Sequence, residues 1–120
     1  ALRCHPEFAV ATTGRAKVQV ALANGTMQDY DLANPEDPKA EKELWFRATD
    51  VPAGTWRILD LDRGMVITDR FKSAQVSQAL LNWNGAQSRV NLELFAPSVN
   101  LNAGQSQTLE HEYEFQRLNK

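Results

Sequence analysis

The sequence predicts an all-β domain, an antiparallel β-sandwich of about eight strands with at most two short helices. Two observations lead to this prediction: short runs of alternating apolar and polar residues recur along the chain, and turn-forming residues separate these runs. The chain has 120 residues, of which 42% are hydrophobic and 23% charged, as in an ordinary globular protein. We therefore expect residues 1–120 to form a single domain, either complete in itself or the later half or an accessory part of a larger protein.

The first hairpin is predicted over residues 16–32. Residues 16–22 alternate in polarity, with Val18 and Val20 on one face. Asn24-Gly25 follows, the typical sequence of a type I′ hairpin turn, in which both central residues have positive φ. The return strand is then expected over residues 26–32.

Two further turn signals predict three more strands. Residues 55–61 and 65–71 both alternate, and a short turn that ends in Gly64 separates them. Asn84-Gly85 leads into another strand, residues 88–95.

The remaining segments are less regular. Ala103-Gly104 precedes a last predicted strand, residues 107–116. Residues 34–43 hold two prolines and six charges, which favours a solvated loop. Residues 71–83 have apolar spacing that fits a short helix and a strand equally well.

Alternation within the strands also predicts the core. Side chains on one face of a strand all point to the same side of its sheet, so the apolar face is expected to be buried. The expected core residues are Val18, Val20, Leu22, Trp56, Ile58, Val90, Leu92 and Leu94.

Composition and motifs exclude several classes of function. A net charge of −2 argues against nucleic acid as a partner, and no apolar run reaches the roughly 20 residues needed to span a membrane. The lone cysteine, Cys4, rules out an internal disulfide and a thiolate zinc site. Nucleophile-elbow, phosphate-loop and dinucleotide motifs are absent, and we expect no cofactor. The chain begins at Ala1, as a processed product or an excised domain would, so its compartment stays open.

The most informative strand is residues 88–95. Val90, Leu92 and Leu94 share one face, while Arg89, Asn91 and Glu93 share the other. A guanidinium, an amide and a carboxylate together can donate and accept hydrogen bonds to sugar hydroxyls. The alternative is an ordinary solvated face of an antiparallel sheet.

Three tryptophans bear on the same hypothesis, because indole rings stack on sugars and also fill cores. Trp56 alternates in phase with Ile58 and is expected to face inward. Trp45 alternates against its apolar neighbours and is the better candidate for exposure. Trp83, beside the turn at Asn84-Gly85, is expected to lie at the rim of the ligand face.

Two histidines complete the list of candidate residues. His111 lies among apolar neighbours and is expected to be a hydrogen-bonded boundary residue rather than a catalytic one. Glu110, Glu112 and Glu114 are expected to form a solvated edge. His5 lacks the spacing of a metal motif, so no metal site is expected.

The C-terminal part of the chain resembles galactose mutarotase-like (aldose 1-epimerase-like) domains. The resemblance rests on Arg89-Val90-Asn91-Leu92-Glu93-Leu94-Phe95-Ala96-Pro97, then on Leu101 and Gly104-Gln105-Ser106, and finally on Tyr113-Glu114-Phe115. It implies a large antiparallel sandwich whose concave polar face binds a sugar.

In active members of that family, a glutamate on a late strand removes the proton of the anomeric hydroxyl, while a histidine on an earlier strand protonates the ring oxygen. The resemblance carries over only Glu93 as the catalytic residue. The family's histidine motif is missing, and His5-Pro6-Glu7-Phe8 does not match it.

We therefore expect a carbohydrate-binding β-sandwich without catalysis of its own, with Arg89, Asn91, Glu93 and Trp83 as ligand-binding residues. Its partners would be a sugar and other domains of a parent chain, with no nucleic acid and no membrane. One alternative is a structural or protein-interaction accessory domain. The other is a fragment of an epimerase-like enzyme in which Glu93 is catalytic.

Overall fold

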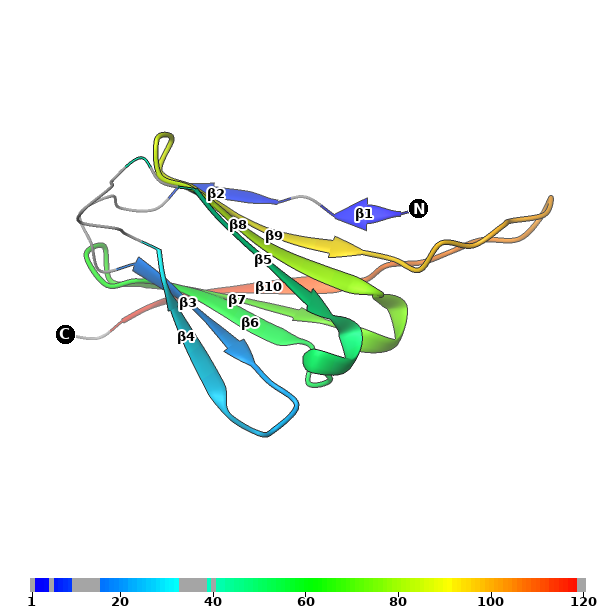
Figure 1. Cartoon of the computed structure of the whole chain (residues 1–120), viewed down its shortest axis with the longest axis horizontal. Coiled ribbons are helices and arrows are strands. Elements are labelled where there is room, and N and C mark those ends of the chain that lie inside the picture. The colour runs from blue at the N-terminus through cyan, green and yellow to red at the C-terminus, as the bar shows by residue number, and fades with distance from the viewer. Residues whose placement is uncertain (1, 5, 10–15, 33–38, 40, 119–120) are drawn as a thin grey trace.

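The computed structural model describes residues 2–4, 6–9, 16–32, 39 and 41–118, and it consists of two antiparallel sheets packed face to face (Figure 1). The β9 sheet has the strand order β1-β9-β8-β5, and β2 pairs with β9 beside β1. The β7 sheet has the order β10-β7-β6-β3-β4. The strands are β1 Arg3–Cys4, β2 Glu7–Ala9, β3 Ala16–Ala21, β4 Met27–Asp31, β5 Glu41–Arg47, β6 Thr55–Asp60, β7 Met65–Phe71, β8 Gln78–Asn84, β9 Arg89–Phe95 and β10 His111–Arg117.

This architecture confirms the predicted all-β antiparallel sandwich. The described residues hold ten strands rather than about eight, because β1 and β2 are two short strands lying one after the other along one edge of β9. Two 3₁₀ helices, Ala48–Asp50 and Ser73–Gln75, are the helical elements of this part of the chain.

The first hairpin forms as predicted, but its turn is of another type. The N–H of Gly25 donates to the carbonyl of Leu22 (3.0 Å), and the N–H of Leu22 donates to the carbonyl of Thr26 (2.9 Å). Gly25 has a φ of 84°, whereas Asn24 is not in the left-handed region. The loop therefore has three residues and a single left-handed glycine, instead of the predicted two-residue type I′ turn.

The ambiguous segments are resolved by pairing between strands. Residues 71–83, which fitted a helix and a strand equally well, contain the second 3₁₀ helix and strand β8, which lies between β5 and β9. Strand β5 begins at Glu41, inside the segment 34–43 expected to be a loop. Residues 34–38 and 40 of that segment lie outside the described residues.

The core fills the space between the two sheets. All the predicted core residues except Leu22 are at most 1% exposed, and Leu22 is partly buried against them. On the side of β4 and β5, Tyr30 packs edge-on against Phe46, with ring centroids 5.9 Å apart. On the side of β2 and β10, Phe8 packs edge-on against Tyr113 at 5.5 Å. Aromatic contacts thus close both sides of the sandwich.

One segment leaves the sandwich. Residues 97–110 run out from the end of β9 and return to β10, forming a long arm that projects from the body (Figure 1). Residues 107–110, which we expected to be the start of the last strand, belong to this arm, and β10 begins at His111. None of the helices in the described part of the chain is long and apolar enough to cross a membrane.

Candidate functional site

The outer face of the β9 sheet, the side turned away from the β7 sheet, carries Arg89, Asn91 and Glu93, three of the four residues predicted to bind a ligand. Val90, Leu92 and Leu94 are 0% exposed in the core, so the intervening side chains of β9 point outward. On this face, Arg89 is accordingly exposed and Asn91 is half-buried. The buried and outward faces of β9 are therefore the ones that the sequence predicts.

Neighbouring strands add polar and aromatic side chains to the same face. Asn82 of β8 lies opposite Asn91, and Glu43 of β5 lies opposite Asn82. Two residues further along β5, Trp45 lies opposite Leu80 of β8. Because residues paired directly across strands share a face, these side chains form one continuous surface.

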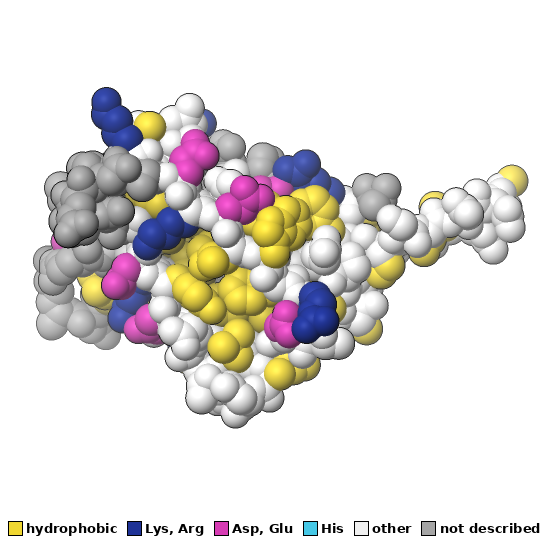
Figure 2. All heavy atoms as spheres, viewed as in Figure 1, with side chains coloured by type: hydrophobic (Ala, Val, Ile, Leu, Met, Phe, Trp, Pro, Cys, Tyr) yellow, Lys and Arg dark blue, Asp and Glu magenta, His cyan; other side chains and the backbone are white. Residues whose placement is uncertain are grey.

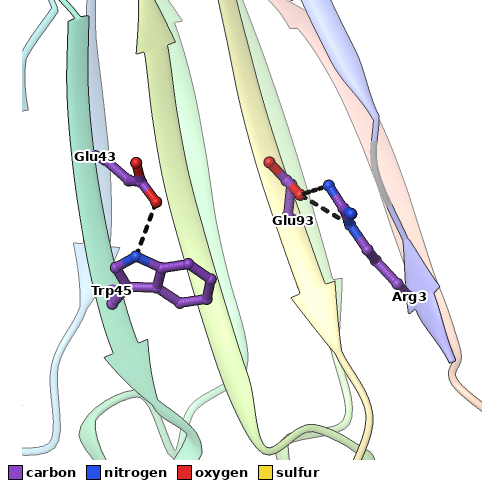
Figure 3. A network of polar contacts seen from close by, with 4 residues as sticks. All are labelled: Arg3, Glu43, Trp45 and Glu93. Atoms are coloured by element: carbon purple, nitrogen blue, oxygen red, sulfur yellow. Dashed lines mark hydrogen bonds and ion pairs between the residues drawn. The ribbon is translucent and has the colours of Figure 1, made fainter. Parts of the chain in front are cut away.

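An aromatic pair lies on this surface, with Trp45 on the edge strand β5 and the partly buried Phe95 at the end of β9. Trp45 is 51% exposed, and its ring centroid lies 5.4 Å from that of Phe95, with 37° between the ring planes. The indole N–H of Trp45 donates to Oε1 of Glu43 at 2.9 Å, which fixes the ring across the sheet (Figure 3). The guanidinium of Arg3 lies over the ring of Phe95, 5.1 Å from its centroid. Trp45 is thus the exposed tryptophan that its alternation predicts.

Glu93 shares this face but is covered. Its side chain is 4% exposed, and its Oε1 accepts hydrogen bonds from Nε of Arg3 at 3.0 Å and from Nη2 of the same guanidinium (Figure 3). Arg3 itself is half-exposed at the edge of the sheet. Arg3 is a site residue that the sequence analysis missed, because 90 positions separate it from Glu93 and no local pattern links the two.

The prediction for Trp83 was wrong. Trp83 is 3% exposed and belongs to the core between the sheets, in phase with the buried Leu81. It lies opposite Val90 on the inner face, so it cannot reach a ligand bound on the outer face. The error follows from treating Trp83 as part of a turn, whereas strand β8 continues to Asn84.

A second polar cluster lies inside the sandwich at the β7 sheet. Asp69 is 0% exposed, and its Oδ2 accepts a 2.8 Å hydrogen bond from the indole N–H of Trp56. Its Oδ1 lies 3.2 Å from Nδ1 of His111. Burial raises the pKa of Asp69, and the bond from Trp56 and the nearby His111 oppose that rise. His111 is the hydrogen-bonded boundary residue that we expected.

Two more titratable side chains lie close to Asp69. Burial, together with the charge of Asp69, raises the pKa of the Cys4 thiol and that of the Tyr113 hydroxyl. The Tyr113 hydroxyl is buried and has no hydrogen-bond partner in the described part of the chain. The imidazole of His111 also packs edge-on against the Tyr113 ring at 4.8 Å.

His111 borders a surface pocket of about 280 Å³, lined by Arg70, Phe71, Lys72, Glu110, His111 and Glu112. The cations of this pocket already have partners: Lys72 pairs with Glu110 at 2.9 Å and Arg70 with Glu114 at 2.7 Å. Glu110 and Glu114 thus neutralise cations at the end of β7 and just after it, rather than forming only a solvated edge. The pocket offers few unpaired charges to a ligand.

No group of three or more potential metal ligands occurs among the described residues, and His5 lies outside them. Comparisons of the chain with protein-family models, with curated proteins and with solved structures find no match. We therefore infer function from the geometry of the outer face of the β9 sheet and of the Asp69 cluster.

Proposed function

We propose that the outer face of the β9 sheet binds carbohydrate. The observation that carries this proposal is the aromatic pair of Trp45, which is 51% exposed, and the partly buried Phe95; a hydrogen bond to Glu43 and the ring contact hold Trp45 in place. A large apolar ring left exposed on a sheet face costs hydration free energy, and stacking a sugar ring on it recovers that loss.

Polar side chains next to the aromatic pair supply the second part of a sugar site. Asn82 and Asn91 lie directly opposite one another on β8 and β9, and each amide has both donors and acceptors. Glu43 adds a carboxylate in the same row, opposite Asn82, with its Oε1 2.9 Å from the indole nitrogen of Trp45. Hydroxyl groups that project from a stacked sugar ring would lie within reach of these three residues.

We propose binding without turnover. A catalytic base must reach the proton that it removes, but Glu93 is nearly covered and its Oε1 is engaged by Arg3. Trp83, the ligand residue predicted beside it, lies in the core. The resemblance of residues 89–115 to mutarotase-like domains supports the same class of ligand, and the epimerase-like alternative would require Arg3 to move away from Glu93.

Intrinsic tryptophan fluorescence can test this proposal. Trp56 and Trp83 are 1% and 3% exposed, so a sugar that changes the tryptophan emission must act mainly on Trp45. We expect a glycan array to identify a ligand and a titration with that sugar to give a saturable change in emission.

The Trp45→Ala variant should lose this binding. Phe115→Ala is the matched control, because Phe115 is an aromatic residue of similar exposure (58%) on the other sheet, and this variant should bind as the parent chain does. Equal binding by both variants, or no glycan that binds at all, would contradict the proposal.

A further inference from the structure

The arm, residues 97–110, rejoins the body where Leu109 packs against the core, but its outer residues 98–106 are all exposed (Figure 1). It has a first leg (97–102), a tip at Ala103-Gly104 and a second leg (105–110). Val99 and Leu101 on the first leg are 50% and 52% exposed. Hydrophobic side chains are visible along the arm in Figure 2, without charged groups on its outer part.

The two legs do not pair with one another as a hairpin does. Within the described part of the chain, the backbone hydrogen bond of the arm is the one from the N–H of Gln105 to the carbonyl of Asn102 at the tip (3.0 Å). The side chain of Gln107 donates to the carbonyl of Pro97 at 2.7 Å, which ties the base of the legs together. Residues 98–101 therefore present backbone donors and acceptors to solvent, as an edge strand does.

The first leg has a pattern that is symmetric about its centre. Its sequence Ser98-Val99-Asn100-Leu101-Asn102 alternates polar and apolar residues on either side of Asn100. If two such legs pair antiparallel about Asn100, Val99 of one copy lies opposite Leu101 of the other on a single apolar face. The opposite face then holds only amide and hydroxyl side chains, which can hydrogen-bond across the pair.

We propose that the first legs of two copies of this chain pair in this way, around a two-fold axis through Asn100. Such a contact is isologous, since the same residues of both copies form it, and it leaves no open end. It covers the exposed Val99 and Leu101 and pairs the backbone groups along one edge of residues 98–101. Because only one leg of each copy is covered, the dimer should be weak and dissociate on dilution.

The two edge strands of the β7 sheet, β10 and β4, are less suited to a second copy. β10 carries Glu112 and Glu114, and the outer edge strand β4 carries the exposed carboxylates of Asp29 and Asp31. A two-fold pairing of such strands would bring like charges together across the interface, which destabilises a β-pair. The first leg of the arm has no charged residue.

The first test is the oligomeric state of the whole chain, measured by analytical ultracentrifugation over a concentration series. We expect a monomer–dimer equilibrium and a dissociation constant at least about tenfold weaker in Leu101→Asp, because each dimer would bury two new carboxylates. Met27→Asp is the matched control, since Met27 is an exposed apolar residue (39%) on β4. It should dimerise as the parent chain does.

The second test fixes the register of the pairing. In a Cys4→Ser background, Asn100→Cys places two thiols across the two-fold axis, where paired Cα atoms lie about 4.5–5.5 Å apart and a disulfide forms readily. We expect this variant to cross-link several-fold faster than Ser106→Cys on the second leg. A chain that is monomeric at all concentrations, a dimer unaffected by Leu101→Asp, or equal cross-linking of the two cysteine variants would overturn the proposal.

Discussion

Trp56 and Asp69 lie directly opposite one another on β6 and β7, and the indole N–H of Trp56 donates a 2.8 Å hydrogen bond to the buried carboxylate of Asp69. His111 approaches the other oxygen of the same carboxylate from β10. This places an ionisable group that is 0% exposed between the two sheets of the sandwich. Burial of a carboxylate without full pairing disfavours its charged form, so the cluster should make folding depend on pH.

The Asp69 carboxyl should reduce stability as pH rises. Its pKa in the folded chain lies above the ordinary value of 3.8 because of burial, so the folded state keeps this proton at a pH where the unfolded chain has lost it. The stability that the protonated Asp69 contributes is therefore fully present below the pKa of this carboxyl in the unfolded chain. It is lost as the pH increases through its pKa in the folded chain.

Urea unfolding of the parent chain and of Asp69→Asn between about pH 4 and 6, below the ordinary range of histidine, measures this effect. The variant should gain stability relative to the parent chain as the pH increases, since a side-chain amide at this position has no proton to lose. If the difference in free energy of unfolding between the two chains stays constant over this pH range, the pKa of Asp69 is not raised.

Gly54 should tolerate no side chain. Its φ is +62°, and a Cβ built on it would lie 2.0 Å from the carbonyl oxygen of Phe71. The N–H of Phe71 donates to the carbonyl of Gly54 at 2.8 Å, so the backbone there has little room to move. We expect Gly54→Ala to lower the free energy of unfolding by roughly 3 kcal/mol or more.

Gly25→Ala is the control for this prediction. Gly25 also has positive φ (+84°), but nothing lies within 4 Å of the Cβ position. Its substitution should cost only about 1–2 kcal/mol, the cost of the left-handed backbone alone. Chemical denaturation of the two variants compares them, and similar losses would mean that the close contact at Phe71 is relieved at little cost.

The core residues of β9 and β8 should be sensitive to truncation. Leu92 is 0% exposed, so Leu92→Ala should destabilise the chain by about 2–5 kcal/mol. Trp83→Ala should cost about 3–5 kcal/mol for the same reason. Equilibrium unfolding gives both values, and a loss below about 0.5 kcal/mol for Leu92→Ala would mean that the face of β9 is reversed.

Much of this fold follows from local sequence. The alternation of Val18 and Val20, and that of Val90 and Leu92, is enough to predict which faces are buried, because the side-chain period of a strand is fixed by its pleat. Trp83 could not be placed in the same way, since residues 71–83 fit a helix and a strand equally well until β5 and β9 are seen to pair on either side of β8.

The candidate site was less accessible to sequence reasoning than the fold. The face that carries Arg89, Asn91 and Glu93 could be derived from alternation, but the cover that Arg3 provides for Glu93 is a contact between distant parts of the chain. The contact of Trp45 with Phe95 likewise depends on the order of β5, β8 and β9 in the sheet, which no local pattern encodes. Only tertiary pairing brings these side chains together.

Glu93→Gln separates the structural role of Glu93 from a role in binding. The change keeps the size of the side chain but removes the charge that pairs with Arg3, and we expect a loss of about 1 kcal/mol in stability because Arg3 is half-exposed. If a bound sugar also uses this carboxylate, binding should weaken by about 1–3 kcal/mol.

Arg3→Met and the double variant complete a thermodynamic cycle for the same pair. The effects on stability should be less than additive, because either single change breaks the ion pair. Additive effects, together with unchanged sugar binding, would mean that Glu93 and Arg3 act independently of one another and that Glu93 has no role in binding.

The central claim, that the outer face of the β9 sheet binds sugar, is tested most directly by ¹H–¹⁵N NMR of the chain titrated with a glycan selected on the array. The indole N–H of Trp45 and the side-chain amides of Asn82 and Asn91 should shift together and saturate at one dissociation constant, while the buried indole N–H of Trp56 stays in place. Shifts confined to His111 and Lys72 at the pocket of the β7 sheet, or no shifts at saturating sugar, would contradict the claim.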